Sequence, residues 1–247
     1  MLVETFARQV IGDLPLRAKT RSTYLSMLKC HVEPTLGALS LEAITRSDIQ
    51  ESLRGLPPQT AAMTLAVIKS VYREAQARGI VESSPAHGIS GPKIMVPPRK
   101  FLTWEEVKLG DFDKYSNCIR FLALHGLRWS EALAITSQDI RDGRIYVAKS
   151  VHGQTKSKAG IRTVPLMCEL PVFPSSPKTL RRVLKPYGVT IHSLRHTYAY
   201  LLKQQGVHVT TAQRLLGHSD PRITMGIYTQ VLDNEIDEAG FILAKAI

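Results

Sequence analysis

The chain has 247 residues, 44% of them hydrophobic and 21% charged, and carries a formal net charge of +11, which suits one large domain or two modest ones. No apolar run approaches the roughly 18 residues that a membrane span needs. The N-terminus lacks the succession of basic, apolar and small residues that marks a signal peptide. We therefore expect a cytoplasmic protein without membrane contact. Cys30, Cys118 and Cys168 are odd in number and widely spaced, which indicates reduced thiols rather than a disulfide framework or a zinc site.

The first half of the chain is predicted to be helical. Apolar residues recur at helical spacing in three segments, namely 20–32, 47–53 and 60–78. Pro34 and Gly37 are expected to end the first helix, and Ser47 with Asp48 to cap the second. After these helices, a stretch rich in prolines and cations, with no hydrophobic periodicity, indicates a linker. We therefore place an all-α domain at 1–92, a linker at 93–98 and a second domain at 99–247.

The second domain is predicted to combine helices with a small antiparallel element. Thr103 and Glu106 form a capping box, so a helix should begin at Trp104. A long helical region, interrupted near Gly126, and three later helices are expected over 117–134, 176–184, 192–204 and 210–216. Two strands, joined by a polar hairpin tip at 156–160, are expected over 144–148 and 162–166.

The positive charge is concentrated in the second domain. Residues 141–222 hold 14 lysines and arginines against three acidic residues, and the formal net charge of the remainder of the chain is zero. Charge alone leaves a merely solvated basic face open. The concentration nevertheless favours a polyanionic partner, nucleic acid before membrane, because no basic amphipathic helix with an aromatic face is evident.

Several short motifs in this domain fit the chemistry of DNA strand cleavage without metal or ATP. Such cleavage needs cations for the phosphate oxygens, a nucleophile that forms a phosphoester, and an acid for the leaving oxygen. The motifs follow in order as GLRWSE from Gly126, TKSKAGIRTVPL from Thr155, HSLRH from His192, LGH from Leu216 and IY from Ile227. This order resembles the tyrosine recombinases of the phage-integrase type. Residues 19–92 are similar to the helical core-binding domain of that family.

Each motif alone has a plainer interpretation. Arg128 and Glu131 could form an ordinary surface ion pair, and Tyr228 a core aromatic residue. His192 and His196 have the i,i+4 spacing of zinc ligands, but the intervening glutamate and a third ligand are missing. Only the conjunction of the matches, with Tyr228 ten residues after His218, makes the resemblance specific.

The resemblance implies a role for each phosphate-binding residue. Arg128 and Arg195 would hold the non-bridging oxygens of the scissile phosphate, because the guanidinium fork bonds two oxygens at once. His218 would assist them, and His192 would add a further hydrogen bond.

The same resemblance implies which residues act as the nucleophile and the general acid. Tyr228 would attack the phosphate and leave a 3′-phosphotyrosyl bond. Lys156 would protonate the leaving 5′-oxygen, with Lys158 as a competing candidate two residues along the hairpin. Glu131 would hold the geometry of the site through hydrogen bonds. No metal or other cofactor is implied.

The implied architecture is a mainly α, two-domain DNA clamp, in which an all-α core-binding domain precedes an α+β catalytic domain. Further DNA contacts are expected at Lys19, Arg21, Thr60, Lys69, Arg73, Lys158, Arg181 and Arg182. Because the chain begins almost directly with the core-binding domain, we expect no additional arm-binding domain in it. The apolar segment 231–247 resembles the family's C-terminal element that docks into a neighbouring protomer.

The implied function is site-specific integration or excision of phage or mobile-element DNA, in the bacterial cytoplasm or nucleoid. The expected partner is double-stranded DNA carrying core-type attachment sites. The protein would be a monomer or weak dimer when free and a homotetramer on two DNA sites. A host DNA-bending protein is a further possible partner. A type IB topoisomerase that relaxes DNA and a non-catalytic DNA-binding regulator with the same fold are the alternatives.

Overall fold

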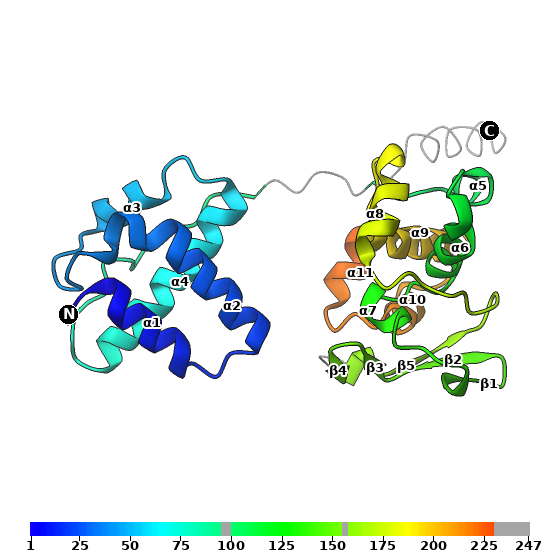
Figure 1. Cartoon of the computed structure of the whole chain (residues 1–247), viewed down its shortest axis with the longest axis horizontal. Helices are drawn as coiled ribbons and strands as arrows, with labels where there is room; N and C mark the ends of the chain where they lie inside the picture. The colour runs from blue at the N-terminus through cyan, green and yellow to red at the C-terminus, as the bar shows by residue number, and fades with distance from the viewer. Residues whose placement is uncertain (95–99, 155–157, 230–247) are drawn as a thin grey trace, which may run out of the picture. The chain divides into compact units, whose positions relative to one another are not determined.

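The chain folds into two compact units, Met1–Val96 and Pro97–Ile247 (Figure 1). The computed structural model describes residues 1–94, 100–154 and 158–229. The first unit is built from helices, and the second joins helices to short antiparallel strands. The expectation of a mainly helical chain with a small antiparallel element is confirmed. Among the described residues, no helix has the length and apolar character needed to cross a bilayer.

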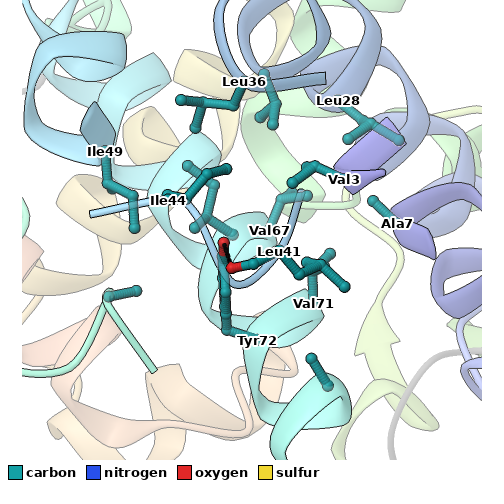
Figure 2. Packing of buried hydrophobic residues seen from close by; sticks show 14 of the residues in the cluster. Val3, Ala7, Leu28, Leu36, Leu41, Ile44, Ile49, Val67, Val71 and Tyr72 are labelled. Atoms are coloured by element: carbon teal, nitrogen blue, oxygen red, sulfur yellow. Dashed lines mark hydrogen bonds between the residues drawn. The ribbon is translucent and has the colours of Figure 1, made fainter. Parts of the chain in front are cut away.

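The core of the first unit forms around its longest helix. The elements are α1 (Val3–Asp13), α2 (Ala18–Met27), a π-helix (Leu28–Gly37), α3 (Arg46–Leu53) and α4 (Pro58–Ala77). Leu65, Ile68 and Tyr72 recur on one face of α4 and are almost fully buried, as expected of an amphipathic helix. Figure 2 shows side chains from α1, the π-helix and α3 gathered around this face.

Two predicted helix boundaries in the first unit were wrong, and a third was right only in part. Pro34 does not end the helical run, because the chain continues past it as a π-helix, which ends at Gly37, the second residue expected to stop it. Helix α3 is capped by Thr45, whose hydroxyl accepts from Asp48 N, and not by Ser47. Helix α4 begins at Pro58 rather than Thr60, since a first-turn residue needs no N–H donor.

The helices predicted in the second unit are confirmed. They are α5 (Trp104–Leu109), α6 (Ser116–His125), α7 (Trp129–Ala132), α8 (Pro177–Leu184), α9 (Ile191–Gln204) and α10 (Val209–Leu216). The capping box of Thr103 and Glu106 starts α5 as expected. A further helix that the sequence patterns did not indicate, α11 (Pro221–Tyr228), follows. Helices α6 and α9 pack against each other, and α9 also contacts α10 and α11.

The sheet of the second unit places the predicted strands beside α10. Its order is β1 (Ile140–Arg141), β2 (Arg144–Val147) and β5 (Arg162–Pro165), all antiparallel, with Ile145 opposite Val164. Both of these residues are fully buried, so one face of the sheet belongs to the core. Strand β5 contacts α10. A second ladder, β3 (Lys149–Ser150) with β4 (Gly153–Gln154), was not predicted.

We predict that Tyr72→Phe lowers the free energy of unfolding of the first unit by about 1–3 kcal/mol. The Tyr72 hydroxyl donates a 3.1 Å hydrogen bond to Leu41 O inside the core (Figure 2), and its loss leaves a buried carbonyl unsatisfied. Urea unfolding of both proteins measures the difference. Tyr24→Phe is the matched control, because within the described residues the half-buried Tyr24 has no hydrogen-bond partner. Equal losses in both variants would contradict the prediction.

Candidate active site

Four of the residues predicted for the site come together from segments far apart in the sequence. Arg128 lies at the start of α7, Glu131 within it, Arg195 on α9 and His218 just after α10. Arg128 reaches the loop after α10 by donating from Nη2 to Gly217 O at 3.1 Å. Arg195 reaches the same place through a hydrogen bond from Nη2 to Leu216 O.

A glycine turn brings the Arg128 segment beside α9. Gly126 ends α6 with a φ of +59°, a conformation that glycine adopts without steric cost. A Cβ atom at this position would lie 2.2 Å from Tyr198 Cδ1, so no other side chain fits. The turn leaves Gly126 O to accept a 2.7 Å hydrogen bond from Arg195 Nη1.

Arg128 is held on both sides of its guanidinium group and remains accessible. Its Nη1 donates to Glu131 Oε1 at 2.7 Å, opposite the bond from Nη2 to Gly217 O. Its backbone N–H also donates to Glu131 Oε2 at 2.9 Å. The side chain is 40% exposed, so an anion arriving from solvent can reach the cation.

Glu131 is a buried carboxylate between two arginines, and the second of them was not predicted. Arg162 on β5 donates from Nη2 to Glu131 Oε2 at 2.8 Å and from Nη1 to Oε1 at 3.3 Å. The two side chains are 5% and 3% exposed. Burial alone would raise the pKa of Glu131, but the hydrogen bonds and charge of Arg162, together with bonds from Arg128, lower this pKa to about 2.

One feature of the sequence could have identified Arg162. It shares a strand face with Val164, two residues away, and Val164 is fully buried. A cation on the inward face of a strand needs a buried partner. The identity of that partner, which is 31 residues away in the chain, comes only from the fold.

Arg195 is a buried cation whose charge is opposed by its neighbours. The residue is 1% exposed, and within the described residues its Nε has no hydrogen-bond partner. Burial first, and then the charges of Arg128 and Arg162, lower the pKa of Arg195 to about 9, while Glu131 acts in the opposite sense. The guanidinium group is therefore charged at neutral pH in a site that attracts a further anion.

His218 is a neutral imidazole beside these cations. It is 7% exposed, and its Nδ1 lies 2.7 Å from Thr224 Oγ1 on α11. Burial, followed by the charges of Arg195, Arg128 and the histidines of α9, lowers the pKa of His218 to about 3. At neutral pH the ring can therefore offer one N–H donor and one acceptor.

The two histidines of α9 lie one helical turn apart. The rings of His192 and His196 are perpendicular, with centroids 5.0 Å apart. His192 lies three residues before Arg195 on α9, on the same side of the helix. Among the residues that the structure describes, no three His, Cys, Asp or Glu side chains are gathered as a metal site would require.

Tyr228 lies at the end of α11 and is half-buried. Its hydroxyl donates a 3.2 Å hydrogen bond to Val207 O, between α9 and α10. Burial raises the pKa of this phenol, so the hydroxyl keeps its proton at neutral pH. The hydroxyl proton is thus engaged by a backbone carbonyl.

The residues predicted in the hairpin tip and in the C-terminal segment lie partly outside the described residues. Lys156 and the segment 231–247 lie outside the described residues, and for Lys158 the backbone alone is described, at the start of a 3₁₀ turn over Lys158–Gly160. Lys156 and Lys158 therefore stay open as candidates for the general acid.

The predicted DNA contacts of the first unit fall in different places. Lys19 lines an open groove between α2 and α4. Lys69 and Arg73 line a second, more polar depression on α4, where Lys69 Nζ donates to Ile89 O at 2.7 Å. Arg21 instead donates to Ile11 O and Leu14 O and so holds the end of α1. Thr60 is half-buried in the first turn of α4.

Two further predicted contacts belong to the second unit. Arg181 and Arg182 are neighbours on α8, and both are exposed to solvent.

Comparison with known proteins identifies relatives of both units. Residues 174–235 match the Phage integrase family, and residues 14–56 match the Phage integrase, N-terminal SAM-like domain. A tyrosine recombinase of Pseudothermotoga lettingae is 27% identical over 238 residues, which cover 80% of this chain and 82% of that protein.

The fold is similar to that of lambda integrase. A lambda integrase dimer bound to a COC′ core site matches with a TM-score of 0.76 and 19% identity, covering 94% of this chain and 79% of that one. A lambda integrase tetramer bound to a Holliday junction matches with a TM-score of 0.75 and 21% identity, covering 90% and 78%. At this level of identity the likeness establishes the fold.

We predict that Glu131→Gln lowers the free energy of unfolding of the second unit by about 3–5 kcal/mol, because it leaves the buried Arg162 without its counter-charge. The loss also changes the response to acid. A carboxylate with a lowered pKa stabilises the fold above its unfolded pKa of about 4.5, and this contribution disappears as the pH falls towards 2. Wild type should therefore lose more stability than the variant between these pH values.

Denaturant unfolding at several pH values measures both effects. Glu105→Gln on α5 is the control, since its ion pair with Lys108 leaves the Glu105 side chain 70% exposed and contributes at most about 1 kcal/mol. A Glu131→Gln variant as stable as Glu105→Gln would contradict the prediction.

Proposed function

The chain belongs to the tyrosine recombinases of the phage-integrase family, and we propose that it cuts and rejoins DNA through a covalent bond between Tyr228 and a 3′-phosphate. As a member of this family it is a site-specific recombinase. The observation that carries the assignment of the site is the cluster of Arg128, Arg195 and His218 at the end of α10, where Arg128 is also bonded to the buried Glu131. Such a cluster is suited to a phosphodiester that becomes more negative in the transition state.

In the proposed mechanism, the arginines bind the two non-bridging oxygens. Arg128 is fixed on one side by Glu131 and on the other by Gly217 O, with an accessible guanidinium group. Arg195 supplies a buried cation anchored to two carbonyls. His218 is neutral and adds a hydrogen bond without further charge, while His192 contributes a second donor. Positioned donors of this kind stabilise charge that develops on the phosphorus oxygens.

Tyr228 breaks the strand by attacking phosphorus. The bond from phosphorus to the 5′-oxygen breaks as the bond to the tyrosine oxygen forms, so the number of phosphoester bonds is unchanged. The 5′-hydroxyl of another strand reverses the step. Before attack, the Tyr228 hydroxyl has to leave Val207 O, and it releases its proton to water as the bond to phosphorus forms. The leaving 5′-oxygen takes a proton from Lys156, the residue we favour over Lys158.

The proposed partner is double-stranded DNA with core-type attachment sites. The lambda integrase structures described above contain a core site in one case and a Holliday junction in the other, which supports this choice. We assign DNA contacts to Lys19, Arg21, Thr60, Lys69 and Arg73 in the first unit and to Lys158, Arg181 and Arg182 in the second. Assembly of four copies on two DNA sites, with exchange of the segment 231–247, belongs to the same proposal.

We predict that Tyr228→Phe binds its DNA site with unchanged affinity and forms no covalent adduct. The substitution removes only the nucleophilic oxygen, and the ring keeps its packing. A suicide substrate that traps the phosphotyrosyl bond measures the adduct on a denaturing gel. Tyr187→Phe is the control, because it too removes a hydroxyl that donates to a backbone carbonyl, Asp111 O, and it should form adduct normally. Adduct formation by Tyr228→Phe would remove Tyr228 from the mechanism.

We predict that Lys156→Ala cleaves ordinary DNA poorly and recovers on DNA in which sulfur replaces the leaving 5′-oxygen. Sulfur is the better leaving group and needs little protonation, so loss of the acid matters less. Arg128→Ala and Arg195→Ala should not recover, since they act on the non-bridging oxygens. Recovery by Lys158→Ala instead would assign the acid to Lys158, and recovery by neither lysine variant would show that the acid is another residue.

A further inference from the structure

Arg162 donates four hydrogen bonds beside the site, more than any other side chain that the structure describes there, and the proposed mechanism gives it no role. Its Nε donates to Leu215 O at 2.7 Å, and its Nη1 donates to Gly160 O at 3.1 Å. Two further bonds join Nη1 and Nη2 to the oxygens of Glu131. One guanidinium group therefore links β5, the 3₁₀ turn before it, α7 and the end of α10.

Arg128 and Arg162 each donate two hydrogen bonds to the carboxylate of Glu131. Oε1 accepts from Nη1 of both arginines, at 2.7 Å and 3.3 Å. Oε2 accepts from the backbone N–H of Arg128 at 2.9 Å and from Arg162 Nη2 at 2.8 Å. The plane of the carboxylate, and with it the direction of the Arg128 fork, is therefore fixed by Arg162.

Arg162 also supports the second anchor of Arg128. That anchor is Gly217 O, and Gly217 follows Leu215, whose carbonyl accepts from Arg162 Nε, by two residues. The packing is tight, because a Cβ atom on Gly217 would lie 3.0 Å from Arg162 Cδ and from its Nη1. Both groups that orient the Arg128 side chain are thus held in place by one buried residue.

We propose that Arg162 is a positioning residue that orients Arg128 toward the scissile phosphate through Glu131 and the end of α10. This inference rests on the proposed function. All three guanidinium nitrogens of Arg162 donate to protein acceptors, and these four hydrogen bonds use four of its five N–H groups, so it acts through Arg128 rather than on the phosphate. Lysine cannot replace it, because a single ammonium lacks the planar fork that satisfies a carboxylate and two carbonyls together.

The test begins with Arg162→Lys, which keeps the charge that Glu131 needs and loses the fork. Single-turnover formation of the covalent adduct should slow on the order of 100-fold, the cost of a catalytic group displaced by about 1 Å. DNA affinity should be unchanged, because the affected interaction is made mainly in the transition state. A rate equal to that of wild type would overturn the proposal.

A substrate with a neutral phosphate separates positioning from general damage. The substrate is a methylphosphonate, in which a methyl group replaces the non-bridging oxygen that Arg128 binds. This removes the negative charge, so a cation at that position is no longer needed. Arg128→Ala and Arg162→Lys should both recover to the wild-type rate on it. If Arg128→Ala recovers and Arg162→Lys stays slow, Arg162 does not act through Arg128, and the proposal is wrong.

One control tests for a purely structural explanation. Arg78→Met in the first unit removes an arginine that also bridges two carboxylates, those of Glu74 and Asp13, and it should lower the melting temperature while leaving cleavage unchanged. If circular dichroism shows that Arg162→Lys is partly unfolded at the assay temperature, all variants are compared on both substrates at a lower temperature at which Arg162→Lys is folded, with the same recovery expected.

The outcome for wild type separates this inference from the proposed function. A wild-type protein that forms no adduct on any suicide substrate contradicts the proposed function itself. A wild-type protein that forms adduct, together with an Arg162→Lys variant that is equally fast on ordinary DNA, contradicts only the role given to Arg162.

Discussion

A single buried carboxylate allows three arginine side chains to occupy one small site. Arg128, Arg162 and Arg195 repel one another, and this repulsion, added to burial, lowers the pKa of Arg195. Glu131 opposes the effect through direct bonds to two of the three. Breaking such a buried pair costs several kcal/mol because the remaining charge is left unpaired. The site therefore retains a net positive charge that the carboxylate only partly offsets, and an anionic phosphate is its natural complement.

Helix ends provide the rest of the support for these cations. Gly126 ends α6, and Leu215, Leu216 and Gly217 end α10, so their carbonyls have no acceptor role within the helix. The carboxyl end of a helix also carries partial negative charge. Arginine donors occupy all four carbonyls. The positive φ of Gly126 and of Gly217 turns the chain at each helix end, which explains why a glycine stands beside each arginine anchor.

The sequence predicts the helices and strands of the second unit well, because their periodicity and capping residues are local. It also indicates Arg128, Glu131, Arg195 and His218, which the fold brings together. Arg162 was missed because its function depends on a partner 31 residues away, whereas the strand pattern around it is ordinary. The π-helix through Pro34 was missed for a similar reason. A proline normally ends an α-helix, and the local sequence pattern gives no sign of the wider turn.

The position of Tyr228 restricts how it can reach a phosphate held by the proposed site. Helix α11 carries both Tyr228 and Thr224, and Thr224 is hydrogen-bonded to His218. A movement of the whole helix would break that bond and displace the imidazole from the arginines. The Tyr228 hydroxyl is bonded instead to Val207 O, in the loop between α9 and α10. A rotation of the Tyr228 side chain, or a change in the last turn of α11 between Thr224 and Tyr228, would bring the hydroxyl into line with the phosphate while His218 stays in place.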